Sequence, residues 1–174
     1  MNISTPVLDE TERNQLINDE EVITRSLIVA AKLDEYLVDL RDLVKSSFSS
    51  LNNDNKYQSK LHGLAWTATY VEALKQMSFW GEELLKSGSF SKTERIILIL
   101  SFSEYLNQLF GGIMMSQNEI IRPADLDHKG VALEKLNCKE VSFFKDEVNV
   151  DHLRSELIKL IIDNESTPFI GNDG

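Results

Sequence analysis

The sequence predicts an all-α protein, a single-domain helical bundle of about four or five helices. Three observations predict it: apolar residues recur at three- and four-residue steps, Gly and Pro number only 8 and 3 in 174 residues, and 42% of the chain is hydrophobic. A chain of this length buries a continuous core without disulfides or metal. We expect a mobile acidic lead (1–18), a helical bundle domain (19–163) and a linker or tail (164–174).

The first helix is expected from about Asp19. Apolar positions from Ile23 to Leu51 follow one stripe, with charged residues on the other side. The polar stretch 46–55 is rich in Ser and Asn, whose side chains compete for backbone hydrogen bonds. A helix should therefore end there and another begin.

The second helix is expected over about Lys56–Ser87 and has two apolar stripes. One stripe carries Leu61, Leu64, Ala65, Ala68 and Val71. The other carries the large aromatic residues Trp66, Tyr70 and Trp80. A helix with two such stripes is central to a bundle, or it covers a second surface outside the domain. Core packing is the favoured role of the aromatic residues, and contact with another polypeptide is the alternative.

The third helix begins at the firmest boundary in the chain. Gly88 is placed as a C-terminal glycine cap, and Ser91-Lys92-Thr93-Glu94 supplies a capping box. Ile96–Leu100 is rich in β-branched residues, which leaves a buried strand open. The capping box and the apolar continuation to Ile113 favour one long helix.

The remaining elements are shorter. Arg122-Pro123 marks a break, because proline removes a donor and restricts the preceding residue. Val131–Leu136 predicts a short helix, and Val141–Phe144 predicts a brief extended piece. A last amphipathic helix is expected over about 149–163.

Charge and cysteine content exclude several classes of function. Lys and Arg total 18 against 28 for Asp and Glu, a net charge of −10, which disfavours nucleic acid and anionic membranes as partners. No apolar run approaches the roughly 20 residues that cross a bilayer. The lone Cys138 forms no internal disulfide, and the first residues do not resemble a signal peptide. We therefore expect a cytoplasmic protein.

The sequence contains no motif typical of a reaction, and we predict no catalytic, cofactor-binding or metal-binding residue. The Glu-x-x-His pairs of di-iron bundles are missing, and Asp125-x-x-His128 lies in a segment expected to be a loop. Gly111-Gly112 has neither glycine-loop spacing nor the Lys of a phosphate loop. Close helix packing or a kink is the favoured account of this pair, and approach of a partner's backbone is the alternative.

Two further stretches are informative: His62–Met77, and Glu104–Leu126, which includes Gly111-Gly112-Ile113 and Met115-Ser116-Gln117-Asn118. Both resemble a region near the amino end of certain acyl-CoA dehydrogenases. Family members use FAD to remove hydrogens from the α and β carbons of an acyl-CoA thioester, with a glutamate as base. The resemblance places that glutamate and the flavin contacts in a separate catalytic part, so neither role falls on this chain.

The resemblance implies a non-catalytic, N-terminal helical module that packs against a catalytic acyl-CoA dehydrogenase domain, in cis or in trans, or against a sister subunit. The alternative is a stand-alone helical interaction module or homodimer without enzymatic activity. The expected contact residues are Trp66, Tyr70, Trp80, Gly111, Gly112, Gln117 and Arg122.

Overall fold

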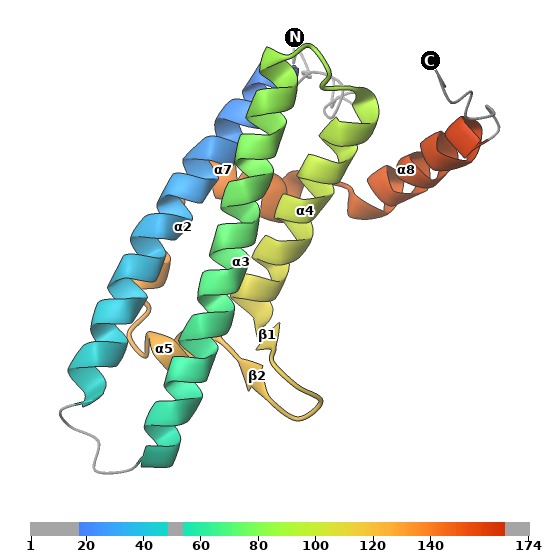
Figure 1. Cartoon of the computed structure of the whole chain (residues 1–174). Coiled ribbons are helices and arrows are strands. Elements are labelled where there is room, and N and C mark those ends of the chain that lie inside the picture. The colour runs from blue at the N-terminus through green and yellow to red at the C-terminus, as the bar shows by residue number, and fades with distance from the viewer. Residues whose placement is uncertain (1–17, 49–53, 166–174) are drawn as a thin grey trace, which may run out of the picture.

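A computed structural model describes residues 18–48 and 54–165 (Figure 1). Most of the expected lead and tail lies outside these residues. The described chain is mostly helical, as predicted. Its elements are α2 (Asp19–Phe48), α3 (Asp54–Lys86), α4 (Lys92–Gly111), β1 (Ile113–Met114), β2 (Ile120–Ile121), α5 (Pro123–Leu126), α6 (Val131–Glu134), α7 (Lys139–Ser142), a π-helix η1 (Phe143–Glu147) and α8 (Val150–Glu165).

The two longest helices, α2 and α3, form an antiparallel pair, and α4 packs beside α3 (Figure 1). The short helices α6 and α7 pack on α2, α5 contacts α2, α3 and α4, and η1 packs on α4. Helix α8 extends from the body of the bundle and has α4 as its principal neighbour. None of the helices in the described ranges is long and apolar enough to cross a membrane.

One core runs through the bundle. Its largest fully buried side chains come from α2, α3, α4 and the segments that follow α4. The Phe102 ring of α4 lies 4.8 Å from the Phe144 ring of η1, and the Arg25 guanidinium lies over Phe143. The members with the most complete burial include Tyr36, Phe102, Phe144, Leu33, Leu40, Leu74, Leu98 and Leu106.

The predicted start of α4 is confirmed. Ser91 is the N-cap, its hydroxyl accepts a hydrogen bond from the Thr93 N–H, and the Glu94 carboxylate accepts one from the Ser91 N–H. Residues Ile96–Leu100 are helical, so the strand alternative is wrong. Apolar residues surround this turn because α4 has neighbours on several sides, which places Ile96 and Leu98 in the core.

Helix α4 ends earlier than predicted. Its last residue is Gly111, and Gly112 has a φ of 131°, which leaves the helical region. Ile113 therefore begins β1 instead of continuing the helix. Strands β1 and β2 pair antiparallel, with Ile113 opposite Ile121. Strands of two residues are too short to show an alternating pattern, so this hairpin could not be predicted from the sequence.

The segment after the hairpin contains one correction. Pro123 begins α5, which confirms the predicted break. Val141–Phe144, predicted to be extended, is instead helical and divided between α7 and η1. The buried contacts of Phe143 and Phe144 override the strand preference of these aromatic residues. The predicted last helix is confirmed as α8, where Asn149 Oδ1 accepts a hydrogen bond from the His152 N–H.

Candidate functional site

The two stretches that carry the dehydrogenase resemblance meet in the fold. Gly63 of α3 lies against Ile121 of β2, and a Cβ atom at position 63 would lie only 2.5 Å from Ile121 Cγ1. The missing side chain lets the hairpin approach the helix closely. The first half of α3, the end of α4 and the hairpin thus form one continuous unit.

His62 connects α3 to the tip of the hairpin. Its Nδ1 lies 3.9 Å from Glu119 Oε2, and its Nε2 accepts a hydrogen bond of 3.0 Å from Trp66 Nε1. An Nε2 that accepts leaves the ring proton on Nδ1, facing the carboxylate. A hollow of about 420 Å³ lies beside this pair, lined by Gln58, Ser59, His62 and Glu119.

Tyr70 connects α3 to α4. Its hydroxyl donates a hydrogen bond of 2.6 Å to Gln108 Oε1, and its ring lies 4.7 Å from the Tyr105 ring. Burial, followed by the neighbouring Tyr105, raises the pKa of Tyr70 above its ordinary value. The Tyr70 hydroxyl is therefore a protonated donor near neutral pH, as this hydrogen bond requires.

Trp80 lies on the same side of α3 as Trp66 and Tyr70. The offsets of 4 and 14 residues place all three within one face of a helix with 3.6 residues per turn. Trp66 and Tyr70 are half-buried and pack against the core, while Trp80 and Tyr105 are each 36% exposed. We call Trp66, Tyr70, Trp80 and Tyr105 the aromatic face. Two of its side chains pack against the core, and the other two are partly exposed to solvent.

The other expected contact residues gather at the hairpin. A Cβ at Gly112 would lie 2.7 Å from Ile120 Cγ2, so Gly112 ends α4 and accommodates β2 instead of kinking a helix. A Cβ added at Gly111 would meet no other atom within 4 Å. Gln117 is exposed at the tip of the hairpin, and the backbone N–H of Arg122 donates to the Asp125 carboxylate at 2.7 Å.

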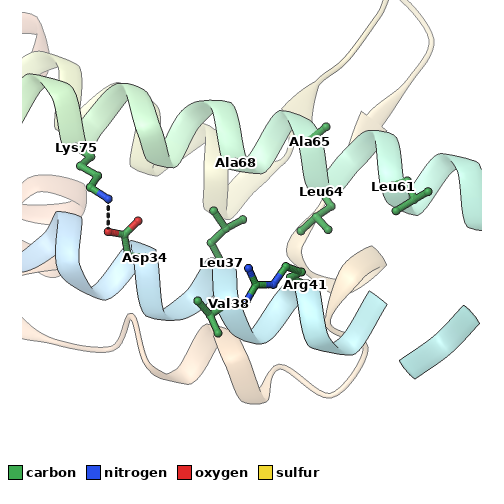
Figure 2. A pocket seen from close by; sticks show the side chains of 9 residues that line it. All are labelled: Asp34, Leu37, Val38, Arg41, Leu61, Leu64, Ala65, Ala68 and Lys75. Carbon is green, nitrogen blue, oxygen red and sulfur yellow. Dashed lines mark hydrogen bonds and ion pairs between the residues drawn. The ribbon is translucent and has the colours of Figure 1, made fainter. Parts of the chain in front are cut away.

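A groove between α2 and α3 is a second candidate site, which the sequence did not reveal (Figure 2). Its volume is about 620 Å³. Figure 2 shows an ion pair between Asp34 and Lys75 at one end, with an N–O distance of 2.7 Å, and Arg41 toward the other. The groove is lined by Asp34, Leu37, Val38, Arg41, Leu61, Leu64, Ala65, Ala68 and Lys75.

The sequence shows the apolar stripe that lines this groove, but not that the stripe is exposed. The second helix was expected to have a stripe through Leu61, Leu64 and Ala68, and that stripe lines the groove. Apolar residues that belong to no buried core cannot be separated from core residues by periodicity alone. Only the position of α2 shows that Leu61 is 42% exposed.

Neither hollow identifies a cofactor site by itself. The groove holds one carboxylate, Asp34, paired with Lys75, together with Arg41, and the hollow beside His62 is lined by Glu119. We assign no residue of this chain to FAD. Within residues 18–48 and 54–165, no three His, Cys, Asp or Glu side chains gather in a way that could hold a metal ion.

The fold and the hairpin site thus define a helical module built from the regions that resemble acyl-CoA dehydrogenases. A specific relative supports the resemblance: the chain is 38% identical over 121 residues to (2S)-methylsuccinyl-CoA dehydrogenase from Cereibacter sphaeroides. The match covers 67% of this chain and 21% of the relative, so the chain is similar to about a fifth of that enzyme. No protein-family model matches the chain.

Proposed function

We propose that this chain acts as a helical accessory module of a flavin-dependent acyl-CoA dehydrogenase and packs against its catalytic part or a sister subunit. The observation that carries the proposal is the match to (2S)-methylsuccinyl-CoA dehydrogenase, which covers most of this chain but a fifth of the enzyme. In this proposal the glutamate base and the FAD contacts belong to the catalytic part and not to this chain. The reaction of that part would be α,β-dehydrogenation of an acyl-CoA thioester.

The aromatic face and the hairpin form the contact surface in this proposal. Trp80 and Tyr105 are each 36% exposed, and at the hairpin Met114 is 66% and Ile120 45% exposed. Burial of such area stabilises an assembly by roughly 25 cal/mol per Å². Aromatic residues with a polar edge dominate contacts of this kind. Trp80 is the residue we expect to contribute most, since it lies outside the core.

The first test is the size of the native polypeptide. An antibody raised against this chain is used to blot a lysate of the source cells, and the recognised protein is captured and its absorbance near 450 nm recorded. A band far larger than 19.8 kDa, or a 19.8 kDa band captured with a yellow dehydrogenase subunit, supports the proposal. A colourless 19.8 kDa protein captured without a dehydrogenase contradicts it.

The second test concerns the contact surface and uses the same native assembly. Trp80→Ala should lower the amount of assembled dehydrogenase, while the circular dichroism of the chain is unchanged because Trp80 is partly exposed. Val131→Ala on α6, which is 59% exposed and away from the aromatic face, is the matched control. Equal assembly of the Trp80→Ala and Val131→Ala variants would rule out the aromatic face as the contact.

A further inference from the structure

We infer that His62 is a proton-dependent switch: its neutral ring binds the Trp66 indole, and its protonated ring binds the Glu119 carboxylate. The three side chains lie where the hairpin meets α3, next to the close contact of Gly63 with Ile121. The switch belongs to this chain alone, so it goes beyond the accessory role proposed above.

The neutral ring is bonded to its own helix. Nε2 of His62 accepts a hydrogen bond of 3.0 Å from Trp66 Nε1, which leaves the ring proton on Nδ1. Nδ1 lies 3.9 Å from Glu119 Oε2, which is too long for a hydrogen bond. In this state the ring therefore binds Trp66 and lies near the hairpin without a hydrogen bond to it.

Protonation exchanges these two partners. Both nitrogens of an imidazolium carry a hydrogen, so Nε2 of His62 can no longer accept from the Trp66 N–H, and two N–H groups face each other. Nδ1–H then directs a positive charge toward the Glu119 carboxylate, at a distance within the range of an ion pair. One nitrogen cannot serve in both states, so the two partners are bound alternately.

Glu119 is the charged group that faces the ring. Gln58 and Ser59, the other described residues that line the hollow, are neutral. The side chains of His62 and Glu119 are 51% and 53% exposed, so a proton from solvent reaches the ring directly. Imidazole is the side chain that exchanges a proton between pH 5 and 8. The switch should therefore respond within this range of pH.

Helices α2, α4 and α5 also pack on α3. Charged side chains on these helices have partners other than His62. Examples are Asp34 and Arg41 of α2, Glu104 of α4 and Asp125 of α5. Glu119 is consequently the group that rewards a positive charge on the ring, while the Trp66 hydrogen bond opposes it.

The first test follows the indole N–H of Trp66 by NMR of the full chain from pH 8 to pH 5. The chain has two tryptophans, and Trp80→Phe leaves the signal of Trp66 alone. In this background the signal should move upfield with the profile of a single proton, because the N–H loses its imidazole acceptor. His62→Gln should abolish the movement, since glutamine offers an acceptor and a donor but takes up no proton.

The other two histidines of the chain provide matched controls. His128 and His152 are both exposed, and His128→Gln or His152→Gln should leave the movement of the Trp66 signal unchanged. Circular dichroism should match for all three variants, because each position is exposed. A Trp66 signal that stays constant from pH 8 to pH 5, or that moves equally in His62→Gln, overturns the inference.

The second test measures the other partner with a double-mutant cycle of His62→Gln and Glu119→Gln, by urea denaturation at two pH values. The coupling should be absent at pH 8 and about two- to fivefold in the unfolding equilibrium constant at pH 5, the range of exposed ion pairs. A coupling that does not grow toward pH 5 would show that no exchange takes place. Both tests use the chain alone, so their failure is distinct from failure to capture a dehydrogenase.

Discussion

Ile121 occupies the space that a side chain at position 63 would fill: the Cβ of an alanine there would lie 2.5 Å from Ile121 Cγ1 and 2.6 Å from its Cδ1. Gly63 belongs to the second helix of the chain, and Ile121 to a two-residue strand after the third. This contact joins the two stretches that resemble an acyl-CoA dehydrogenase.

Gly63→Leu should destabilise the fold by about 1–3 kcal/mol, because an added side chain forces the hairpin away from α3. Ile121→Ala in the same chain should recover part of that loss, since it removes the atoms in conflict. Urea denaturation measures both free energies of unfolding. Gly111→Ala is the matched control: the space around its Cβ position is open, so it should be neutral or stabilise by up to about 1 kcal/mol. Strictly additive effects at positions 63 and 121 would contradict the contact.

Ser91→Ala should lower the free energy of unfolding by about 1 kcal/mol, because the N-cap of α4 is lost. The hydrogen bond from Ser91 lowers the pKa of Glu94 below its ordinary 4.5. The stability that depends on ionised Glu94 is present above that ordinary value and is lost as the pH falls through the lowered pKa. The difference between wild type and Glu94→Gln, measured by urea denaturation, should therefore shrink under acid conditions. Ser89→Ala, in the loop before α4, serves as the control.

Tyr36→Phe should extend the stability of the fold to higher pH. Burial, and then the negative charge of Asp127, raise the pKa of Tyr36 well above its ordinary 10.0. Because this pKa is raised, the protonated Tyr36 hydroxyl contributes its full stability below pH 10. That contribution is lost as the pH rises toward the pKa of Tyr36 in the folded state. The midpoint of alkaline unfolding, followed by circular dichroism, should rise for Tyr36→Phe. An equal rise for Tyr105→Phe, at a residue that is 36% exposed, would show that burial of Tyr36 is not the cause.

Tyr70→Phe should lower the free energy of unfolding by about 0.5–1.5 kcal/mol, the usual net contribution of one hydrogen bond. The ring contact with Tyr105 remains in this variant, so the change isolates the bond to Gln108. A double-mutant cycle with Gln108→Ala measures the coupling between the two side chains. A coupling of zero would mean that the hydrogen bond contributes nothing in solution.

Local signals predicted the long helices, and tertiary contacts decided the rest. The capping box at Ser91 and the proline at position 123 act on the residues next to them, so their effects are visible in the sequence. The hairpin depends on Gly63, which in the sequence resembles any glycine within a helix. The π-helix depends on burial of Phe144 against Phe102 of another helix. Neither contact leaves a local pattern.

Of the candidate sites, one could be predicted from the sequence and the other could not. Aromatic spacing predicted that Trp66, Tyr70 and Trp80 share a face of one helix, which the structure confirms. The groove between α2 and α3 could not be predicted, because the exposure of Leu61 depends on what α2 leaves uncovered. Periodicity identifies an apolar face but not its neighbour.

Helix α8 has α4 as its principal neighbour, and Leu153 is the buried side chain among its residues 150–163. Ion pairs from Arg154 to Glu104 and from Glu156 to Lys92 add partly exposed contacts, which contribute little. Its backbone amides should consequently exchange with deuterium through a local opening, at a lower free energy than those of α2 and the middle of α4. Native-state exchange would then separate two cooperative units in this one domain, and α8 would be the first to open.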